Sequence, residues 1–276
     1  MIVINQQLVQ LGQINQELLS TEKSRILKLM NKYSEVYSYQ TMQQLEFELE
    51  LRTQIIQASY LLWQSKARFA TFKTSKCNEQ YWNRTEKGGF QLKENVLPAS
   101  ALEDIFHNGH QYAFECATAI IIVFYKGVLE CIGETYFNRL FTNLLLYNGK
   151  YDEDLNLFTY KGSDFLPGDC VYFKNPDHNP DTPQWQGENA IIVEEDLYYG
   201  HGIGIRSAKG IIDALNTKRK ENAEQSAFLT EYITRVDFHY LSQFYVKVRE
   251  SFISNQQFQQ SLNLAICQIG SKTYLA

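Results

Sequence analysis

The sequence predicts an α+β fold, with helices in the first half of the chain and strands in the second. Helical spacing of apolar residues dominates up to about residue 147, and short apolar runs separated by turn residues follow Asn148. The mainly apolar run 116–131 is too long for an ordinary strand, because strands average about five or six residues. We expect this run to form a central buried helix, packed on the sheet that the later strands build.

The helical half carries clear start and stop signals. Thr41-x-x-Gln44 and Ser100-x-x-Glu103 are capping boxes, which mark helix N-termini. Gly133 ends the apolar run, and Gly88-Gly89 supplies the turn of a hairpin. The elements expected in this half are helices over 42–66, from Pro98 to Gly109, over 116–131 and over 134–147, and a hairpin over 80–93.

The second half has short strands and one proline-rich loop. Four of the five prolines lie between 167 and 183, so the loop 175–186 is expected to be ordered by proline rather than by a helix. The strands expected in this half are 155–160, 169–174, 189–195, 197–205 and one near 232–237, with a helix over 207–219 before the last of them.

We expect a single domain over residues 1–245. Residues 1–40 are rich in glutamine and weakly patterned, with one short helix near 26–32, and are expected to form an N-terminal extension packed on that domain. Residues 246–276 form a Gln-rich C-terminal extension. This tail is expected to lack fixed structure, and the alternative is a strand docked through Leu262, Leu264 and Ile266.

Composition argues against several classes of function. The net charge of −5 and the pI near 5.6 are unlike those of an electrostatic nucleic-acid binder. No basic leader opens the chain and Lys126 interrupts the longest apolar run, so we expect no membrane span and synthesis in the cytoplasm. The five cysteines include no C-x-x-C pair, and no acidic calcium loop is present. We therefore expect neither a metal nor another cofactor.

Cys116 is the residue that most strongly suggests chemistry. It opens the apolar helix, where unpaired backbone N–H groups favour an anion, so its thiol is expected to ionise near neutral pH. Glu188 stands at the mouth of an apolar strand, and His201 lies between two glycines, where another group can approach closely. Such a thiol, carboxylate and imidazole are the parts of a cysteine acyl-transfer site. The alternatives are a core cysteine, a salt bridge for Glu188 and a structural histidine.

Four segments occur in the order found in one known family. They are Tyr112-Ala-Phe-Glu-Cys-Ala-Thr-Ala119, Gly168-Asp-Cys-Val-Tyr-Phe-Lys-Asn-Pro176, Gln184-Trp-Gln-Gly-Glu-Asn189 and His201-Gly-Ile-Gly204. Through them the chain resembles, from about Gln40 to about Arg235, the spore-coat transglutaminase of bacilli, a protein-glutamine gamma-glutamyltransferase. This resemblance implies a papain-like core of the NlpC/P60 kind, with a nucleophilic cysteine at the N-terminus of a helix packed on an antiparallel sheet.

The resemblance also implies roles for individual catalytic residues. Cys116 would be the nucleophile and Glu188 its proton acceptor, with Glu115 as a second or substitute partner. His201 matches the histidine of the family, and its role as base, orienter or structural support stays open. A carboxylate acts as a base near neutral pH only if its pKa rises, so Glu188 is expected to be desolvated.

Substrate-binding residues follow from the same resemblance. Trp185 and Asn189 would line the site, and the nearby aromatic residues Tyr172 and Phe114 would contribute an apolar wall around Glu188. One departure from the family is Asn148, where an aspartate is expected. Another is the tail, because the chain continues about thirty residues beyond the end of the family core.

The reaction implied by the resemblance joins a protein glutamine to a protein lysine through a thioester on Cys116. The partners would be spore-coat proteins, with the enzyme made in the mother-cell cytoplasm and then located in the coat. Glutamines within 256–260 would be candidates for self-cross-linking. The alternatives are a cysteine amidase or protease of the NlpC/P60 type and a non-enzymatic structural coat protein.

Overall fold

The computed structural model describes residues 1–14, 19–245, 266–269 and 272–275. Its helices are α1 (Thr21–Lys32), α2 (Met42–Gln64), α3 (Pro98–His107), α4 (Cys116–Leu140), α5 (Ala208–Asn216) and α6 (Phe238–Leu241). Its strands are β1 (Ile2–Ile4), β2 (Gln7–Val9), β3 (Tyr37–Tyr39), β4 (Arg68–Phe69), β5 (Trp82–Arg84), β6 (Phe90–Leu92), β7 (Ala113–Phe114), β8 (Leu145–Leu146), β9 (Leu157–Lys161), β10 (Cys170–Lys174), β11 (Gly187–Glu194), β12 (Leu197–Gly200), β13 (Gly204–Arg206), β14 (Phe228–Val236), β15 (Ile266–Ile269) and β16 (Lys272–Leu275).

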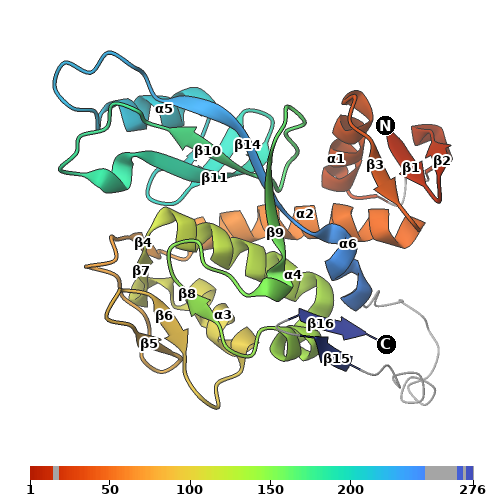
Figure 1. Cartoon of the computed structure of the whole chain (residues 1–276), viewed down its shortest axis with the longest axis horizontal. Coiled ribbons are helices and arrows are strands. Elements are labelled where there is room, and N and C mark those ends of the chain that lie inside the picture. The colour runs from red at the N-terminus through yellow and green to blue at the C-terminus, as the bar shows by residue number, and fades with distance from the viewer. Residues whose placement is uncertain (15–18, 246–265, 270–271, 276) are drawn as a thin grey trace.

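A six-stranded antiparallel sheet and a pair of long helices form two packed layers (Figure 1). The strand order is β13-β12-β11-β10-β14-β9, and the central strand β11 contacts both α2 and α4. Helix α5 packs on β12, β13 and β14, and α3 packs on α4. In Figure 1 the sheet β4-β7 lies at the left end of α4 and the sheet β5-β6-β8 lies to its lower left, while α1 and the sheet β2-β1-β3 lie at one end of α2. The predicted α+β fold is confirmed.

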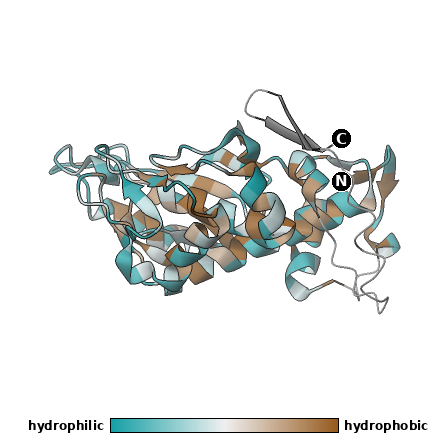
Figure 2. Ribbon diagram, turned by 90° about the horizontal axis from the view of Figure 1, so that it is seen from below, coloured by the Kyte–Doolittle hydropathy of each residue, from teal (hydrophilic) through white to brown (hydrophobic). Residues whose placement is uncertain are grey.

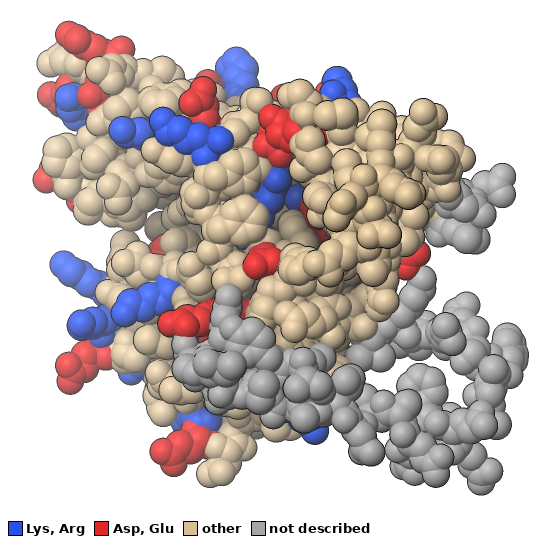
Figure 3. Space-filling view, turned by 45° about the vertical axis from the view of Figure 1, so that its right-hand side comes forward, with Lys and Arg blue, Asp and Glu red and all other residues tan. Residues whose placement is uncertain are grey.

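Hydrophobic residues concentrate where these layers face each other (Figure 2). The larger cluster joins α2 and α4 to the inner face of the sheet, which contributes Ile191, Val193 and Val236. A second cluster lies between the sheet and α5, where Ile211 and Leu215 meet the strands. The surface is different: charged side chains of both signs are interspersed over the face in Figure 3.

Helix α4 is buried on almost all sides, as the long apolar run predicts. Within the described residues it is the one helix long and apolar enough to cross a membrane, but 83% of its most apolar window is buried inside the protein. Gly127 lets it approach α2 closely, because a Cβ there would stand 2.7 Å from the Ile55 side chain. Its interior cation, Lys126, is paired with Glu103 and Glu130. These are the properties of a central core helix.

In the helical half, most predicted elements are confirmed and two details are wrong. Helix 42–66 and the hairpin 80–93 are present, and Thr41 caps α2 by accepting a hydrogen bond from the Gln44 N–H. Helix α3 begins at Pro98 without a side-chain cap, so Ser100 lies inside the helix rather than before it. Gly133 does interrupt α4, with a φ of 75°, but the following helical segment ends at Leu140 instead of 147. The next residues form β8, which pairs with β6.

In the second half, every predicted strand is present, with different limits. The strand expected over 197–205 is two strands, β12 and β13, because the chain turns at His201-Gly202. The strand expected near 232–237 is longer and begins at Phe228. The loop 175–186 contains only the short 3-10 turn η5 (Pro183–Trp185), as its prolines indicate.

The two ends of the chain have more structure than their sequences suggest. Helix α1 begins at Thr21 rather than near 26, and residues 1–9 and 37–39 form a small sheet that the sequence pattern does not reveal. In the C-terminal extension, β15 and β16 pair as an antiparallel hairpin, so the expected lack of structure is wrong for these residues. The glutamines at 256–260 and two of the three proposed docking residues, Leu262 and Leu264, lie outside the described residues.

A buried ion cluster connects the two layers. Asp169, just before β10, accepts hydrogen bonds from Arg52 of α2 at 2.7 Å and from Arg235 of β14 at 2.7 Å. Glu48 and Asp164 accept from the same two guanidinium groups. Burial alone would raise the pKa of Asp169, but Arg235 and Arg52 outweigh it and hold that pKa below its usual range. Asp169 therefore stabilises the fold while it is ionised.

Replacing Asp169 by asparagine is expected to destabilise the protein by about 3–5 kcal/mol, because it leaves two buried guanidinium groups without their shared charge. Thermal unfolding followed by circular dichroism is the measurement. The matched control is Asp213→Asn, which removes a carboxylate from the exposed Lys209–Asp213 pair and should cost less than about 0.5 kcal/mol. Equal losses in the two variants would contradict the role given to this cluster.

Candidate active site

Cys116 is the first residue of α4, and Glu115 caps the helix. The Glu115 backbone is extended, and its carboxylate accepts hydrogen bonds from the N–H groups of Ala117 at 2.6 Å and Thr118 at 2.7 Å. The Thr118 hydroxyl donates to the same carboxylate at 2.5 Å. Glu115 is therefore adjacent to the thiol in sequence, but its oxygens are occupied by the helix N-terminus.

Glu188 comes from the other layer, near the start of β11. Glu188 is 1% exposed and forms no salt bridge among the described residues, so that part of the structure does not support the salt-bridge alternative. Neither carboxylate oxygen has a hydrogen bond of good geometry, although the Cys116 thiol and the His201 backbone are close enough to favour the ionised form. A Cβ on Gly200 would stand 2.9 Å from the Glu188 Oε1. The glycine before His201 is thus explained by the close approach of this carboxylate.

Burial and like charge dominate the electrostatics of the thiol and the carboxylate. Burial raises the pKa of Glu188 well above its usual range, and the charge of Glu115 raises it further. Burial also raises the pKa of the Cys116 thiol, as do Glu188 and Glu115, and the Asn189 donors only partly oppose these effects. The expected raised pKa of Glu188 is confirmed. The expectation that Cys116 ionises near neutral pH at the helix N-terminus is wrong, because burial and the charges of Glu188 and Glu115 raise the pKa of its thiol.

His201 lies behind this pair as a neutral, packed side chain. It is 3% exposed, and burial lowers its pKa to about 4. Its Nδ1 is 3.0 Å from the Tyr199 hydroxyl, and its ring stacks on Phe114 at 4.7 Å. The Nε2 atom is buried without a hydrogen-bond partner in the described structure. A buried imidazole that stays neutral above pH 5 fits a supporting position.

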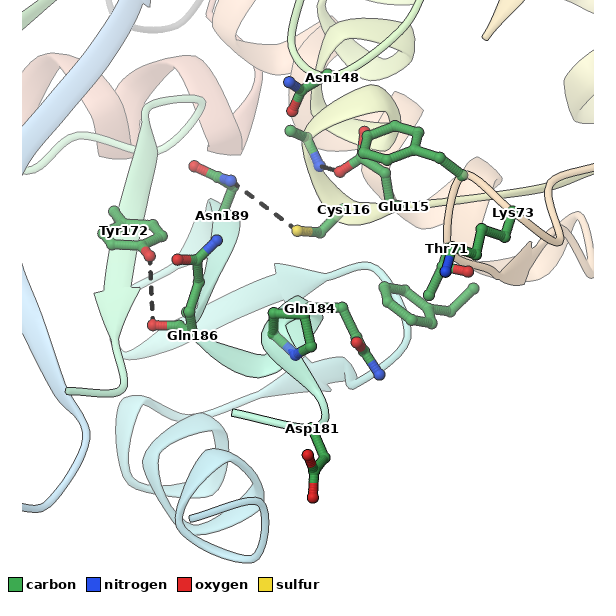
Figure 4. A pocket seen from close by; sticks show the side chains of 15 residues that line it. Thr71, Lys73, Glu115, Cys116, Asn148, Tyr172, Asp181, Gln184, Gln186 and Asn189 are labelled. Atoms are coloured by element: carbon green, nitrogen blue, oxygen red, sulfur yellow. Dashed lines mark hydrogen bonds between the residues drawn. The ribbon is translucent and has the colours of Figure 1, made fainter. Parts of the chain in front are cut away.

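The thiol opens onto a cavity of about 560 Å³ between the two layers. Figure 4 shows the Cys116 Sγ facing Asn189 of β11, whose side-chain Nδ2 is 4.0 Å away. Tyr172 of β10, directly opposite Asn189 in the strand register, also lines the cavity. The residues that line the cavity are Phe69, Thr71, Phe72, Lys73, Glu115, Cys116, Ala117, Asn148, Tyr172, Asp181, Pro183, Gln184, Gln186, Gly187 and Asn189.

Two predicted wall residues lie behind this lining rather than in it. Phe114 packs on His201, and Trp185 stacks on Phe69 at 5.3 Å. The Lys218 ammonium lies over the Trp185 ring, 5.4 Å from the ring centroid. Trp185 therefore joins the proline-rich loop to the end of β4, and it holds Phe69 at the edge of the cavity.

The sequence did not identify Lys73, Gln184, Gln186 or Asp181 as site residues. Lys73 lies in a polar loop with no local pattern, whereas the other three lie in the proline-rich loop 175–186, whose sequence does not show which side chains face the site. Only the tertiary structure brings these loops to Cys116. Within the described residues, no group of three or more His, Cys, Asp or Glu side chains is arranged to hold a metal ion. The arrangement is a half-buried thiol on the wall of an open cavity with a buried carboxylate close to it, which suits acyl transfer through sulfur.

Comparison with known proteins agrees with this geometry. A family model described as protein-glutamine gamma-glutamyltransferase matches residues 1–245. The chain belongs to this family. The enzymes of that name from Bacillus cereus (strain B4264) and Bacillus mycoides (strain KBAB4) are each 49% identical to this transglutaminase over 245 residues, which make up 88% of its length and 89% of theirs.

A solved relative supports the fold of the transglutaminase. The structure described as transglutaminase from Geobacillus stearothermophilus, without its C-terminal extension, is 58% identical and has a TM-score of 0.73. It covers 75% of this chain and 99% of its own. The resemblance inferred from the four sequence motifs is confirmed, and the family match begins at residue 1 rather than near Gln40. The transglutaminase is an acyltransferase that acts on protein glutamine.

Replacing Glu115 by glutamine is expected to shift the acidic limb of the pH–activity profile to lower pH. Glu115 raises the pKa values of both Glu188 and Cys116, so removing its charge lowers them. The measurement is the pH dependence of kcat/KM for incorporation of a fluorescent amine into a protein substrate. A limb that stays in place or moves to higher pH would contradict this coupling.

Replacing Glu188 by glutamine is expected to lower cross-linking strongly and to raise thermal stability. Because the pKa of Glu188 is raised in the folded protein, the ionised form costs free energy that grows from about pH 4, the unfolded value, up to the folded pKa. The neutral amide avoids this cost, so the variant should be more stable than the parent at pH 8 and gain little at pH 4. Melting temperatures at the two pH values test this. A variant less stable than the parent transglutaminase at pH 8 would refute it.

Proposed function

We propose that Cys116 is the nucleophile and Glu188 its proton acceptor, in a transglutaminase that cross-links the proteins of a spore coat. The observation that supports the pair is its position: the half-buried Cys116 thiol lines the cavity, and the buried Glu188 carboxylate lies close to that thiol behind the cavity lining. Their like charges oppose double ionisation, so the pair holds one negative charge at the pH of catalysis. Moving one proton from sulfur to carboxylate then generates the thiolate.

The acylation step follows from this pair. The Cys116 thiol gives its proton to Glu188 while Sγ attacks the γ-carbonyl carbon of a substrate glutamine. The tetrahedral intermediate collapses, the proton passes to the departing nitrogen, and ammonia leaves. A thioester between the glutamyl group and Sγ remains.

The transfer step uses the same groups. The ε-amine of a substrate lysine attacks the thioester carbon and gives a proton to Glu188. The carbon–sulfur bond breaks, the proton returns to the sulfur, and an Nε-(γ-glutamyl)lysine bond joins the two proteins. Water in place of the amine would convert the glutamine to glutamate, so exclusion of water by the buried walls favours cross-linking.

Glu115 and His201 have supporting roles in this proposal. Glu115 caps α4 and sets the pKa values of the pair through its charge. His201 holds Phe114, the residue before Glu115, by ring stacking. Trp185 keeps Phe69 at the cavity, and Tyr172 forms a wall beside the pair.

The test of the proposed nucleophile is Cys116→Ala in an assay of fluorescent-amine incorporation. Incorporation should fall to background, because no other group on the cavity wall can form the thioester. Cys170→Ala is the matched control, since this thiol lies in the core and should be dispensable for chemistry. Full activity of Cys116→Ala would refute the mechanism.

The proposed partners and location rest on the resemblance to the enzymes of bacilli, and the same variant tests them. Coats purified from spores that express Cys116→Ala should lack the isopeptide cross-links formed by the parent transglutaminase. We also propose that glutamines at 256–260 act as acyl donors in self-cross-linking. Mass spectrometry of the incubated enzyme reads this out, and peptides from 256–260 without isopeptide bonds would exclude it.

A further inference from the structure

Three residues of the sheet layer form a polar wall of the cavity. They are Tyr172 of β10, Gln186 just before β11 and Asn189 of β11. Tyr172 can lie across the start of β11 because residue 187 is a glycine, where a Cβ would stand 2.1 Å from the Tyr172 hydroxyl oxygen. The Cys116 thiol belongs to the helical layer, across the cavity from this wall (Figure 4). A glutamine side chain attacked by the thiol must therefore lie beside the polar wall.

Two of the three polar side chains on this wall already have protein partners. The Asn189 Nδ2 is 4.0 Å from the Cys116 Sγ, and the Tyr172 hydroxyl donates to the backbone carbonyl of Gln186 at 3.4 Å. The Gln186 carboxamide differs from both, because no hydrogen bond joins it to another residue in the described part of the chain. In Figure 4 it points to the part of the cavity where Asn189 faces the sulfur. It is therefore free to bind a substrate.

The backbone of Gln186 is fixed although its side chain is free. Its N–H donates to the Pro183 carbonyl at 3.1 Å, and its carbonyl accepts from the Asn175 N–H at 2.9 Å. The preceding residue, Trp185, stacks on Phe69 at 5.3 Å. A fixed backbone limits the positions that the carboxamide can reach, which reduces the entropy that is lost when a substrate binds.

The nitrogen of a substrate carboxamide needs an uncharged acceptor in this cavity. The NH₂ group has two N–H donors, and leaving them without acceptors after they lose their water costs free energy. The Glu115 carboxylate already accepts from the helix N-terminus, and Glu188 takes the thiol proton in the proposed mechanism. The side-chain oxygen of Gln186 accepts a hydrogen bond without adding a charge that would raise the pKa of the thiol further.

We propose that the Gln186 side-chain oxygen accepts a hydrogen bond from the γ-carboxamide nitrogen of the substrate glutamine and so selects the acyl donor. The inference rests on the proposed function of Cys116 as nucleophile. The contact holds the nitrogen while the bond from Sγ to carbon forms. The carbon–nitrogen bond then breaks, and the nitrogen leaves as ammonia with the proton that came from the thiol. A γ-ester and a γ-carboxylate have no N–H at this position, so neither makes the contact.

The experiment compares two acyl donors with Gln186→Leu, which removes the acceptor and keeps a similar size. One donor is a peptide with a single glutamine, and the other is the same peptide with glutamate γ-methyl ester at that position. The measurement is kcat/KM for each donor at a saturating concentration of fluorescent amine, because kcat/KM for a donor reports only thioester formation. It should fall about 3–10-fold for the glutamine peptide and less than about twofold for the ester.

Two further variants act as controls. Gln186→Glu keeps an acceptor oxygen, and the effect of its charge on the thiol is common to both donors. The ratio of the two kcat/KM values should therefore stay near that of the parent enzyme. Gln184→Leu removes a carboxamide that lines the same cavity but points away from the sulfur in Figure 4, and it should leave this ratio unchanged. Melting temperatures of all three variants show whether the fold is kept.

The possible results separate the hypotheses. Equal losses for the two donors in Gln186→Leu would overturn the proposal, because Gln186 would then act on the thiol or on the shape of the cavity. Unchanged values for both donors would overturn it as well. So would a loss confined to the glutamine peptide in Asn148→Leu but absent in Gln186→Leu, since Asn148 is a carboxamide elsewhere on the cavity wall. Amine incorporation by Cys116→Ala would instead refute the proposed nucleophile, so failure of the proposed function is distinguishable from failure of this inference.

Discussion

The charge of Asp169 is the constraint on which the site depends. Cys116 belongs to the helical layer and Glu188 to the sheet, and neither layer contains both halves of the pair. Asp169 binds Arg52 of α2 and Arg235 of β14 at the point where β10 begins. Strand β10 in turn sets the register of β11, in which Phe173 stands opposite Glu188. Because α2 also packs along α4, this one carboxylate couples the position of Glu188 to that of Cys116.

In this arrangement, several groups that can carry a negative charge lie close together in a poorly solvated part of the protein. Glu188 has a raised pKa and no good hydrogen bond, in contrast to Asp169, whose two arginines keep it ionised. Burial alone would act in the same direction on both side chains. The difference lies in their partners, and it separates a carboxylate that stabilises the fold from one that is available to accept a proton.

The sequence predicts a structural feature well when the residues that determine the feature are neighbours in the chain, and poorly when they are distant. The all-round apolarity of α4, the Gly133 break and the hairpin turn are local, and all three are confirmed. The sheet formed by residues 1–9 and 37–39 was missed because its three-residue strands show too little alternation to be recognised. For the site, the sequence motifs predict Cys116 and Glu188, and the structure places their side chains close together. The motifs could not give the direction of the thiol pKa, because it depends on carboxylates that only the tertiary structure assembles.

The two glycines around His201 have a consequence for anyone who redesigns this protein. A side chain at Gly200 would enter the space of Glu188, and one at Gly202, where φ is 97°, would stand 2.9 Å from the Phe69 side chain. Neither glycine touches the sulfur, yet both define the volume that the reacting groups occupy. In a randomised library, Gly200 and Gly202 are expected to tolerate as little substitution as Cys116. The useful diversity for changing substrate preference lies instead in the loops carrying Lys73, Asp181 and Gln184, where side chains face open space.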